Sequence, residues 1–396
     1  MGEFLNVPEI FGSDVFNEAT MQQRLPEHVY HAWKNCVITG SQLPLDVANE
    51  IAEGMKLWAI EKGATHYTHW FQPMTGITAE KHDSFISPTG DGRVIMEFGG
   101  KELVKGESDG SSFPNGGLRA TFEARGYTAW DPTSCAFVKD GSLYIPTCFF
   151  SYTGESLDKK TPLLRSMDEV SREALRILRL FGDTETKRVI ANVGAEQEYF
   201  LLPKDLYAQR EDMRLTGRTL FGAQPPKGQE LDDHYFGTIR TRVSSFMKDL
   251  DEQLWRLGIL SKTKHNEGAP CQHEMAPIFT DANTACDDNQ LIMEIMKKCA
   301  AKHNLVAIVL RRIQLRAHPQ KLARYAAEQI LGKRELKAHN GLQQHVVRLH
   351  QSVPDGAIRR LAEIAALRVL EVSAACDQLH TYVGERAAGE HAGMLS

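Results

Sequence analysis

Several features of other protein classes are missing from this 396-residue sequence. No apolar run reaches the length of about 20 residues that a membrane-spanning helix needs, so we expect no membrane partner. The first residues lack the basic and then apolar pattern of a signal peptide. The seven cysteines form no C-x-x-C pair. An odd number of scattered cysteines suits a reducing compartment, so we expect a cytoplasmic protein.

Glycine-rich loops that cradle phosphate groups are also missing. Neither a Walker A segment nor a G-x-G-x-x-G segment occurs in the sequence. A phosphate site in this chain would therefore depend on metal ions and side chains. The net charge is −5, which argues against a general nucleic-acid-binding surface, so we expect no nucleic-acid partner.

Two glutamates stand two residues apart in the segment VGAEQEYFLL. The flanking segments KRVIANV and YFLL are rich in β-branched, aromatic and aliphatic residues, which predicts a strand. Residues i and i+2 of a strand point to the same side, so Glu196 and Glu198 project together, with Gln197 opposite. Either this is a solvated strand face, or a divalent cation lies between the two carboxylates. The motif alone leaves both interpretations open.

A second acidic group lies in the segment KHNEGAPCQHE at 264–274. It contains Glu267 and Glu274, with His265 nearby. Four glutamates on two strand-like segments could converge in one sheet, and such a geometry suits Mg²⁺ or Mn²⁺ clamping a nucleotide phosphate. A polar loop is the alternative. Zinc ligation by Cys271 with His265 and His273 is less favoured, because no second cysteine stands at ligand spacing.

The remaining pattern predicts a mixed α+β protein. Residues 20–63 are predicted to form helices that begin near proline and end at glycine. Short β-like runs cut by glycine and proline continue to about residue 150. The later predicted elements are amphipathic helices within 162–182, 227–258 and 281–304, and a buried strand at 305–310.

Longer segments resemble one enzyme family. VGAEQEYF and KHNEGAPCQHEMAPIF resemble the two metal-carrying segments of glutamine synthetases. GATHYTHWFQPMTGITAEKHDSFISP, FPNGGLRATFEARGYTAWDPTSCAF, LDKKTPLLRSM and GRTLFGAQPPKGQELDDHYFG resemble the type III branch in particular. The resemblance is nearly continuous from about residue 15 to about residue 306.

This resemblance implies a domain organisation and an assembly. It implies N-terminal helices with a β-grasp-like domain at 1–130. A partial catalytic domain, built on a curved antiparallel sheet with helices, would follow at 131–310. The divergent residues 311–396 are predicted to form a helical tail. The family further implies a homo-oligomer of stacked rings, with each active site between neighbouring subunits.

The implied reaction joins ammonium to L-glutamate, driven by ATP, through γ-glutamyl phosphate, with Mg²⁺ or Mn²⁺ as cofactor. By position in the family motifs, Glu198, Glu267 and Glu274 match the ligands of the metal that holds glutamate. Glu196 matches a ligand of the second metal, which bridges the nucleotide phosphates. Asp83 matches the acidic loop that binds and deprotonates ammonium in a neighbouring subunit, and a hydrated surface loop is the alternative. The residues that bind the nucleotide itself are not identified.

The resemblance stops near residue 310. The family's Asn-Gly-Ser-Gly turn and the metal-binding histidine after it do not follow, and residues 311–396 contain no Phe or Trp. A shifted reading frame or broken gene, a truncated paralogue, and a replacement tail are three explanations. Two functions therefore stay open: a glutamate–ammonia ligase of impaired activity, or a non-catalytic relative with an assembly or regulatory role. We also expect the tail to pack poorly against the 305–310 strand.

Overall fold

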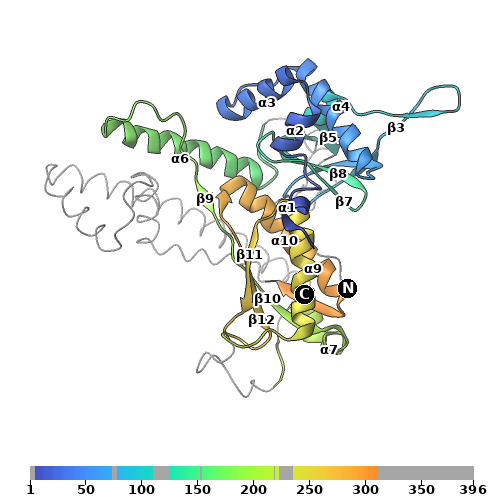
Figure 1. Ribbon diagram of the computed structural model, residues 1–396, viewed down its shortest axis with the longest axis vertical. Helices are drawn as coiled ribbons and strands as arrows, with labels where there is room; N and C mark the ends of the chain where they lie inside the picture. The colour runs from blue at the N-terminus through green and yellow to red at the C-terminus, as the bar shows by residue number, and fades with distance from the viewer. Residues whose placement is uncertain are drawn as a thin grey trace, which may run out of the picture. The chain divides into compact units, whose positions relative to one another are not determined.

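The computed structural model describes residues 5–73, 78–109, 125–151, 154–217, 219–222 and 235–309. Figure 1 shows how the elements of this part are arranged. The helices are α1 (Val7–Ile10), α2 (Glu18–Arg24), α3 (Glu27–Thr39), α4 (Leu45–Glu61), α5 (Gly100–Val104), α6 (Lys160–Leu180), α7 (Lys204–Ala208), α8 (Glu211–Thr216), α9 (Thr241–Arg256) and α10 (Ala282–Lys302). Among the described residues, no helix has the length and apolar character needed to cross a membrane.

The strands alternate with these helices along the chain. They are β1 (His66–Trp70), β2 (His82–Ser84), β3 (Ile86–Pro88), β4 (Val94–Met96), β5 (Lys105–Asp109), β6 (Arg125–Trp130), β7 (Phe137–Lys139), β8 (Ser142–Ser151), β9 (Asn192–Val193), β10 (Gln197–Pro203), β11 (Ser261–Asn266), β12 (Gln272–Pro277), β13 (Thr280–Asp281) and β14 (Leu305–Val309). The mixed α+β class predicted from the sequence is therefore confirmed.

The N-terminal helices begin and end where the sequence predicts. α3 follows Pro26 and ends at Gly40, whose φ is +70°. α4 follows Pro44, and Gly63 stands just after its last turn with a φ of +85°. Proline suits the first turn because it has no N–H to leave unpaired, and glycine adopts the left-handed conformation without a Cβ clash. These two kinds of residue set the helix boundaries.

A mixed sheet forms the N-terminal part of the fold. Its strands run in the order β2–β1–β8–β6–β5, and β7 also pairs with β8. β1 and β8 are parallel, and the other pairs are antiparallel. Helix α4 packs on this sheet, because its fully buried Ile51 and Met55 share a core with Leu143 and Ile145 of β8. A helix packed on a sheet with a parallel strand pair agrees with the predicted β-grasp-like domain.

Four antiparallel strands form a second sheet in the order β11–β12–β10–β14. Burial alternates along β10, where Gln197, Tyr199 and Leu201 are buried and the residues between them are partly exposed. Helices α9 and α10 cover the face that carries Tyr199 and Leu201, and they contribute Phe246 and Ile292 to the same core (Figure 1). The side chains of alternate β10 residues therefore point away from the helices.

One predicted strand is shorter than the sequence indicates. KRVIANV was expected to run continuously into the glutamate pair, but β9 contains only Asn192 and Val193. β9 pairs with β13 in a separate two-stranded sheet, and β10 begins at Gln197. Gly194 lies between the two strands, where a Cβ would stand 3.3 Å from Phe279 Cβ. The chain changes sheets at this point, so Glu196 directly precedes β10 and is not part of it.

A buried lysine connects the two parts of the fold. Lys160, the first residue of α6, is 2% exposed. Its ammonium lies 2.9 Å from Asp131 and also contacts Asp287 of α10. Gln72 Nε2 and Ser134 Oγ each donate a hydrogen bond of 2.6 Å to Asp287. Buried charges are tolerated only when paired and hydrogen-bonded, and this group satisfies both conditions.

The predictions for the C-terminal region fall partly outside the described residues. β14 ends at Val309, which agrees with the predicted strand at 305–310. The predicted helical tail, and its packing against that strand, concern residues 311–396 and lie outside the described part. The division at residues 130 and 310 stays a prediction.

Candidate metal centre

Pairing between strands places three polar side chains in one row. Glu198 of β10 stands opposite Glu274 of β12, and Glu274 stands opposite His265 of β11. Directly paired residues of antiparallel strands share a face of the sheet. The face is the one opposite to helices α9 and α10, because Tyr199, the neighbour of Glu198, is buried against those helices. The i, i+2 argument assumed that Glu196 lies in the same strand, but Glu196 precedes β10, so only Glu198 of this pair is placed in the row by strand pairing.

Glu267 joins this row from the hairpin between β11 and β12. It lies two residues after His265, and its N–H donates to the carbonyl of Gln272 at 2.9 Å. His265 Nε2 lies 3.1 Å from Glu274 Oε1 and 3.6 Å from Glu267 Oε1. One ligand atom from each of the three side chains lies within 4.8 Å of the others. Such spacing suits a group of side chains that share one cation.

The electrostatics of this cluster favour a positive partner. Only 10% of the Glu274 side chain is exposed. Burial raises the pKa of Glu274, and the negative charges of Glu196 and Glu267 raise it further, while His265 opposes them. Carboxylates that repel one another in a partly dry site gain most from a shared divalent cation.

Gln272 holds the remaining carboxylate in place. Its Nε2 donates a hydrogen bond of 2.7 Å to Glu198 Oε2, and its Oε1 accepts one of 3.1 Å from the N–H of Ala269. The amide is therefore fixed by the hairpin and orients Glu198. Glu196 is exposed just before β10, and its charge acts on both Glu274 and Tyr235.

The sequence offered His265 only as part of the less favoured zinc site. Its Nδ1 lies 2.6 Å from the carbonyl oxygen of Asn266. A carbonyl only accepts hydrogen bonds, so Nδ1 donates to it, and Nε2 faces the carboxylates, 3.1 Å from Glu274 Oε1. Metal-binding histidines are commonly oriented in this way. The signal that could have identified His265 is its i, i+2 spacing from Glu267, the same spacing that relates Glu196 to Glu198.

The other candidates lie apart from this cluster. Cys271 is exposed in the β11–β12 turn, and the buried His273 bonds to Asn266 Oδ1 at 3.0 Å. Asp83 lies on β2 in the N-terminal sheet, where its side chain is 47% exposed and 3.5 Å from Lys81 Nζ. The chain does not bring Asp83 into the sheet that carries the glutamates.

Comparison with known proteins identifies the family. The model for "Glutamine synthetase type III N terminal" matches residues 7–166, and the model for "Glutamine synthetase, catalytic domain" matches residues 172–313. The chain belongs to the type III glutamine synthetase family. The resemblance seen in the sequence is thereby confirmed, and all four glutamates of the candidate centre lie within the catalytic-domain match of this family.

Individual relatives agree with this assignment. The chain is 51% identical over 305 residues to type-3 glutamine synthetase of Dictyostelium discoideum. These aligned residues make up 76% of this chain and 42% of that protein. It is 52% identical over 300 residues to glutamine synthetase of Bacteroides fragilis (strain YCH46), covering 76% and 41%. The chain thus spans about two fifths of the length of these curated relatives. Among solved structures, Plasmodium falciparum glutamine synthetase aligns with a TM-score of 0.44 at 16% identity, over 62% of this chain and 47% of that one.

Proposed function

We propose that this chain contributes to ATP-dependent ligation of ammonium to L-glutamate through γ-glutamyl phosphate. The observation that carries the proposal is the convergence of Glu267, Glu274 and His265 in one row with Glu198. In the proposal, Glu198, Glu267 and Glu274 hold the Mg²⁺ or Mn²⁺ ion that positions glutamate. When bound, such an ion neutralises the charge that develops on the transferring phosphoryl group.

The chain's own side chains prepare this site. Glu267 and Glu274 supply negative charge in a partly buried position, so that cation binding relieves their repulsion. The Gln272 amide fixes the Glu198 carboxylate before any ligand arrives. Glu196, which is more exposed, would hold the nucleotide-side ion. Because Mg²⁺ requires near-ideal octahedral oxygen coordination, we expect the Glu196 side to bind more weakly.

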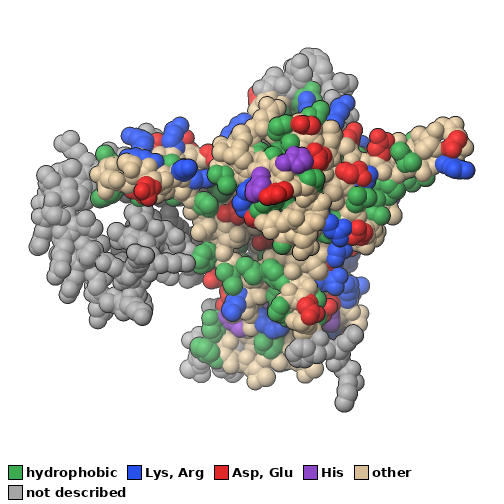
Figure 2. Space-filling view, turned by 45° about the horizontal axis from the view of Figure 1, so that its top comes forward, with side chains coloured by type: hydrophobic (Ala, Val, Ile, Leu, Met, Phe, Trp, Pro, Cys, Tyr) green, Lys and Arg blue, Asp and Glu red, His purple; other side chains and the backbone are tan. Residues whose placement is uncertain are grey.

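We also propose a homo-oligomer in which Asp83 acts at the site of a neighbouring subunit. Asp83 is half-exposed on β2 and thus available to another chain. The adjacent β3–β4 hairpin carries exposed Ile86, Val94 and Ile95, and Figure 2 shows hydrophobic side chains along this projecting arm. Exposed apolar groups of this kind favour association. Light scattering on the purified chain, with Val94→Asp as the interface variant, tests the assembly.

A non-catalytic role in assembly or regulation is the second candidate. It is favoured by the end of the catalytic-domain match at residue 313, while no Asn-Gly-Ser-Gly turn occurs in the sequence. In this case the glutamate-side cation would still bind. Formation of γ-glutamyl phosphate would be negligible, because loss of one preorganised electrostatic contact already costs about 10²–10³ in rate.

Calorimetric titration with Mn²⁺ and a biosynthetic assay test both candidates. We expect one tight Mn²⁺ site that is lost in Glu267→Ala and kept in Glu185→Ala, which removes an exposed carboxylate elsewhere. Glutamine formation from glutamate, ammonium and ATP would support the ligase, and Mn²⁺ binding without turnover would support the second candidate. Mn²⁺ binding that is unchanged in Glu267→Ala would refute the proposed centre itself.

A further inference from the structure

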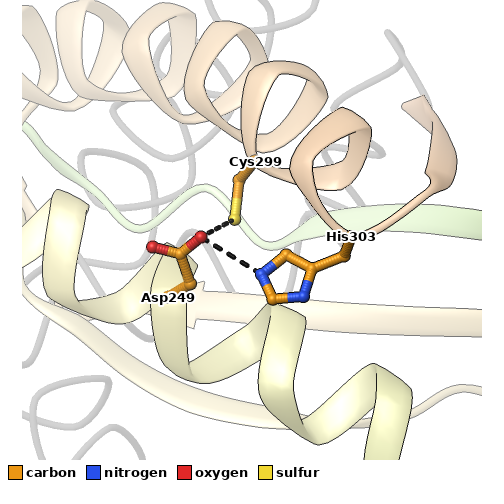
Figure 3. A group of neighbouring side chains, drawn as sticks. All are labelled: Asp249, Cys299 and His303. Atoms are coloured by element: carbon orange, nitrogen blue, oxygen red, sulfur yellow. Dashed lines mark hydrogen bonds and ion pairs between the residues drawn. The ribbon is translucent and has the colours of Figure 1, made fainter.

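A second group of metal-ligating side chains lies between the helices that cover the opposite face of the sheet. Asp249 lies in α9 and Cys299 lies in α10, and His303 directly follows the last residue of α10 as its C-cap. Figure 3 shows the three side chains pointing toward one another. Asp249 Oδ2 lies 3.2 Å from Cys299 Sγ and 3.1 Å from His303 Nε2. All three ligand atoms lie within 4.8 Å of one another.

The surrounding contacts fix this arrangement. Cys299 and His303 are four residues apart at the end of α10, which places them on the same face of the helix. The Arg242 guanidinium of α9 donates to the carbonyl of His303 at 3.1 and 3.2 Å and so fixes that end of α10. Gln253 Nε2 donates a 3.0 Å hydrogen bond to Asp249 Oδ1, which leaves Oδ2 directed at the group. Metal-binding side chains are typically oriented by hydrogen bonds of this type from neighbouring groups.

We propose that Asp249, Cys299 and His303 bind a thiophilic divalent cation of the zinc type. Zinc bonds of about 2.0–2.3 Å in a tetrahedral site place ligand atoms roughly 3.3–3.5 Å apart. The measured separations of 3.1 and 3.2 Å fall a few tenths of an ångström short of this, so small side-chain shifts admit the ion. The Asp249 and His303 side chains are 35% and 23% exposed, so a water molecule completes the fourth position from the solvent side.

Binding exchanges protons for the ion. Without metal, the Cys299 thiol donates to Asp249 Oδ2. On binding, Cys299 would release its proton to solvent and bond as thiolate, while the proton that His303 Nε2 donates to Asp249 would move through solvent to Nδ1 and leave Nε2 to bond to the ion. One thiolate and one carboxylate then balance the charge of the dication. Coordination to a dication favours the deprotonated thiol, so the ion itself would hold Cys299 as thiolate.

This site and the carboxylate centre select different ions. The carboxylate centre offers mainly oxygen ligands, which suit Mg²⁺ and Mn²⁺. The group at Cys299 offers sulfur, nitrogen and oxygen, which suit zinc and cobalt. A large excess of Mg²⁺ therefore occupies the carboxylate centre and leaves the Cys299 site free.

Cobalt titration of the full chain in excess Mg²⁺ tests the proposal. We expect a thiolate-to-cobalt charge-transfer band that saturates at one equivalent and disappears when Zn²⁺ is added. Cys299→Ser should remove the band, and His303→Gln should weaken cobalt binding by at least about tenfold. Two controls should keep the band: Cys286→Ser, which removes another α10 thiol, and Glu267→Ala, which alters the carboxylate centre.

A band that persists in Cys299→Ser overturns the proposal, and so does the absence of a band at saturating cobalt. Cys299 is fully buried, so its variant is first checked for native circular dichroism. If that variant does not fold, His303→Gln decides, because its partly exposed side chain can change without disturbing the core. Unchanged cobalt affinity in His303→Gln would then refute the site.

Discussion

Replacing Lys160 by methionine tests the buried charge group that joins the two parts of the fold. Methionine keeps the length and apolar stem of lysine and removes only the ammonium. Asp131 and Asp287, both at most 5% exposed at their side chains, would then face each other's charge without a counter-ion. Breaking a buried ion pair by removing one partner costs about 3–5 kcal/mol. With about 2–4 °C per kcal/mol for a chain of this order of size, we expect Tm to fall by roughly 10 °C.

The dependence on pH distinguishes lost charge pairing from lost packing. Burial opposes the charge on Lys160, yet the two carboxylates outweigh it and raise its pKa, so its contribution is complete below the unfolded value and lost only at strongly basic pH. Burial likewise opposes the charge on Asp131, but Lys160 holds its pKa below the usual range, so its contribution is lost only in strong acid. Near neutral pH Lys160 and Asp131 are therefore fully effective, while burial raises the pKa of Asp287 and offsets part of their contribution.

The stability of the Lys160→Met variant should, in contrast, change with pH in the range just below neutral. Its two unpaired carboxylates take up a proton more readily when folded, so the variant should recover stability as the pH falls from neutral toward about 5. Differential scanning calorimetry at several pH values measures this. Lys298→Met is the matched control, because Lys298 also contacts two carboxylates but is 51% exposed, and we expect at most about 1 kcal/mol there. Equal effects of the two variants, or a Lys160→Met loss independent of pH, would refute the reasoning.

Two further predictions concern the candidate centre and the N-terminal packing. Because the pKa of Glu274 is raised, protons compete with the ion, and Mn²⁺ affinity should fall by up to about tenfold per pH unit below that pKa, as calorimetry at successive pH values can measure. Affinity that stays unchanged as the pH is lowered from neutral through the acid range would contradict this. Gly100→Ala should lower Tm, since its Cβ would stand 2.5 Å from the backbone nitrogen of Asn49 and force α5 away from α4. The control Gly40→Ala meets no atoms within 4 Å and tests backbone strain alone, so the two variants separate a steric clash from a left-handed conformation.

Local pattern was enough to predict several parts of this fold. Proline and glycine gave the ends of α3 and α4, because each acts on the backbone within one turn. The aromatic and aliphatic residues of YFLL gave the strand character of β10.

Contacts between distant segments could not be predicted in the same way. Nothing local indicates that Glu198 pairs with Glu274, because strand register depends on partners more than 70 residues away. The break between β9 and β10 was missed because the flanking segment has strand composition but pairs elsewhere. Lys160 appears in the sequence as one of two adjacent lysines, and only the approach of α10 makes it a buried ion-pair partner.

The two proposed cation sites lie on opposite sides of strand β10, because neighbouring residues of a strand point to opposite faces. Glu198 projects to the carboxylate face, while the next residue, Tyr199, is fully buried against the helices on the other face. Phe246 of α9 packs against Tyr199, with ring centroids 5.9 Å apart, and its carbonyl oxygen lies 3.7 Å from Cys299 Sγ. An ion at Cys299 would therefore fix α9 to α10 directly behind the strand that carries Glu198. Because packed elements transmit small shifts, zinc bound on the helical side should stiffen the sheet on which the carboxylate centre is built.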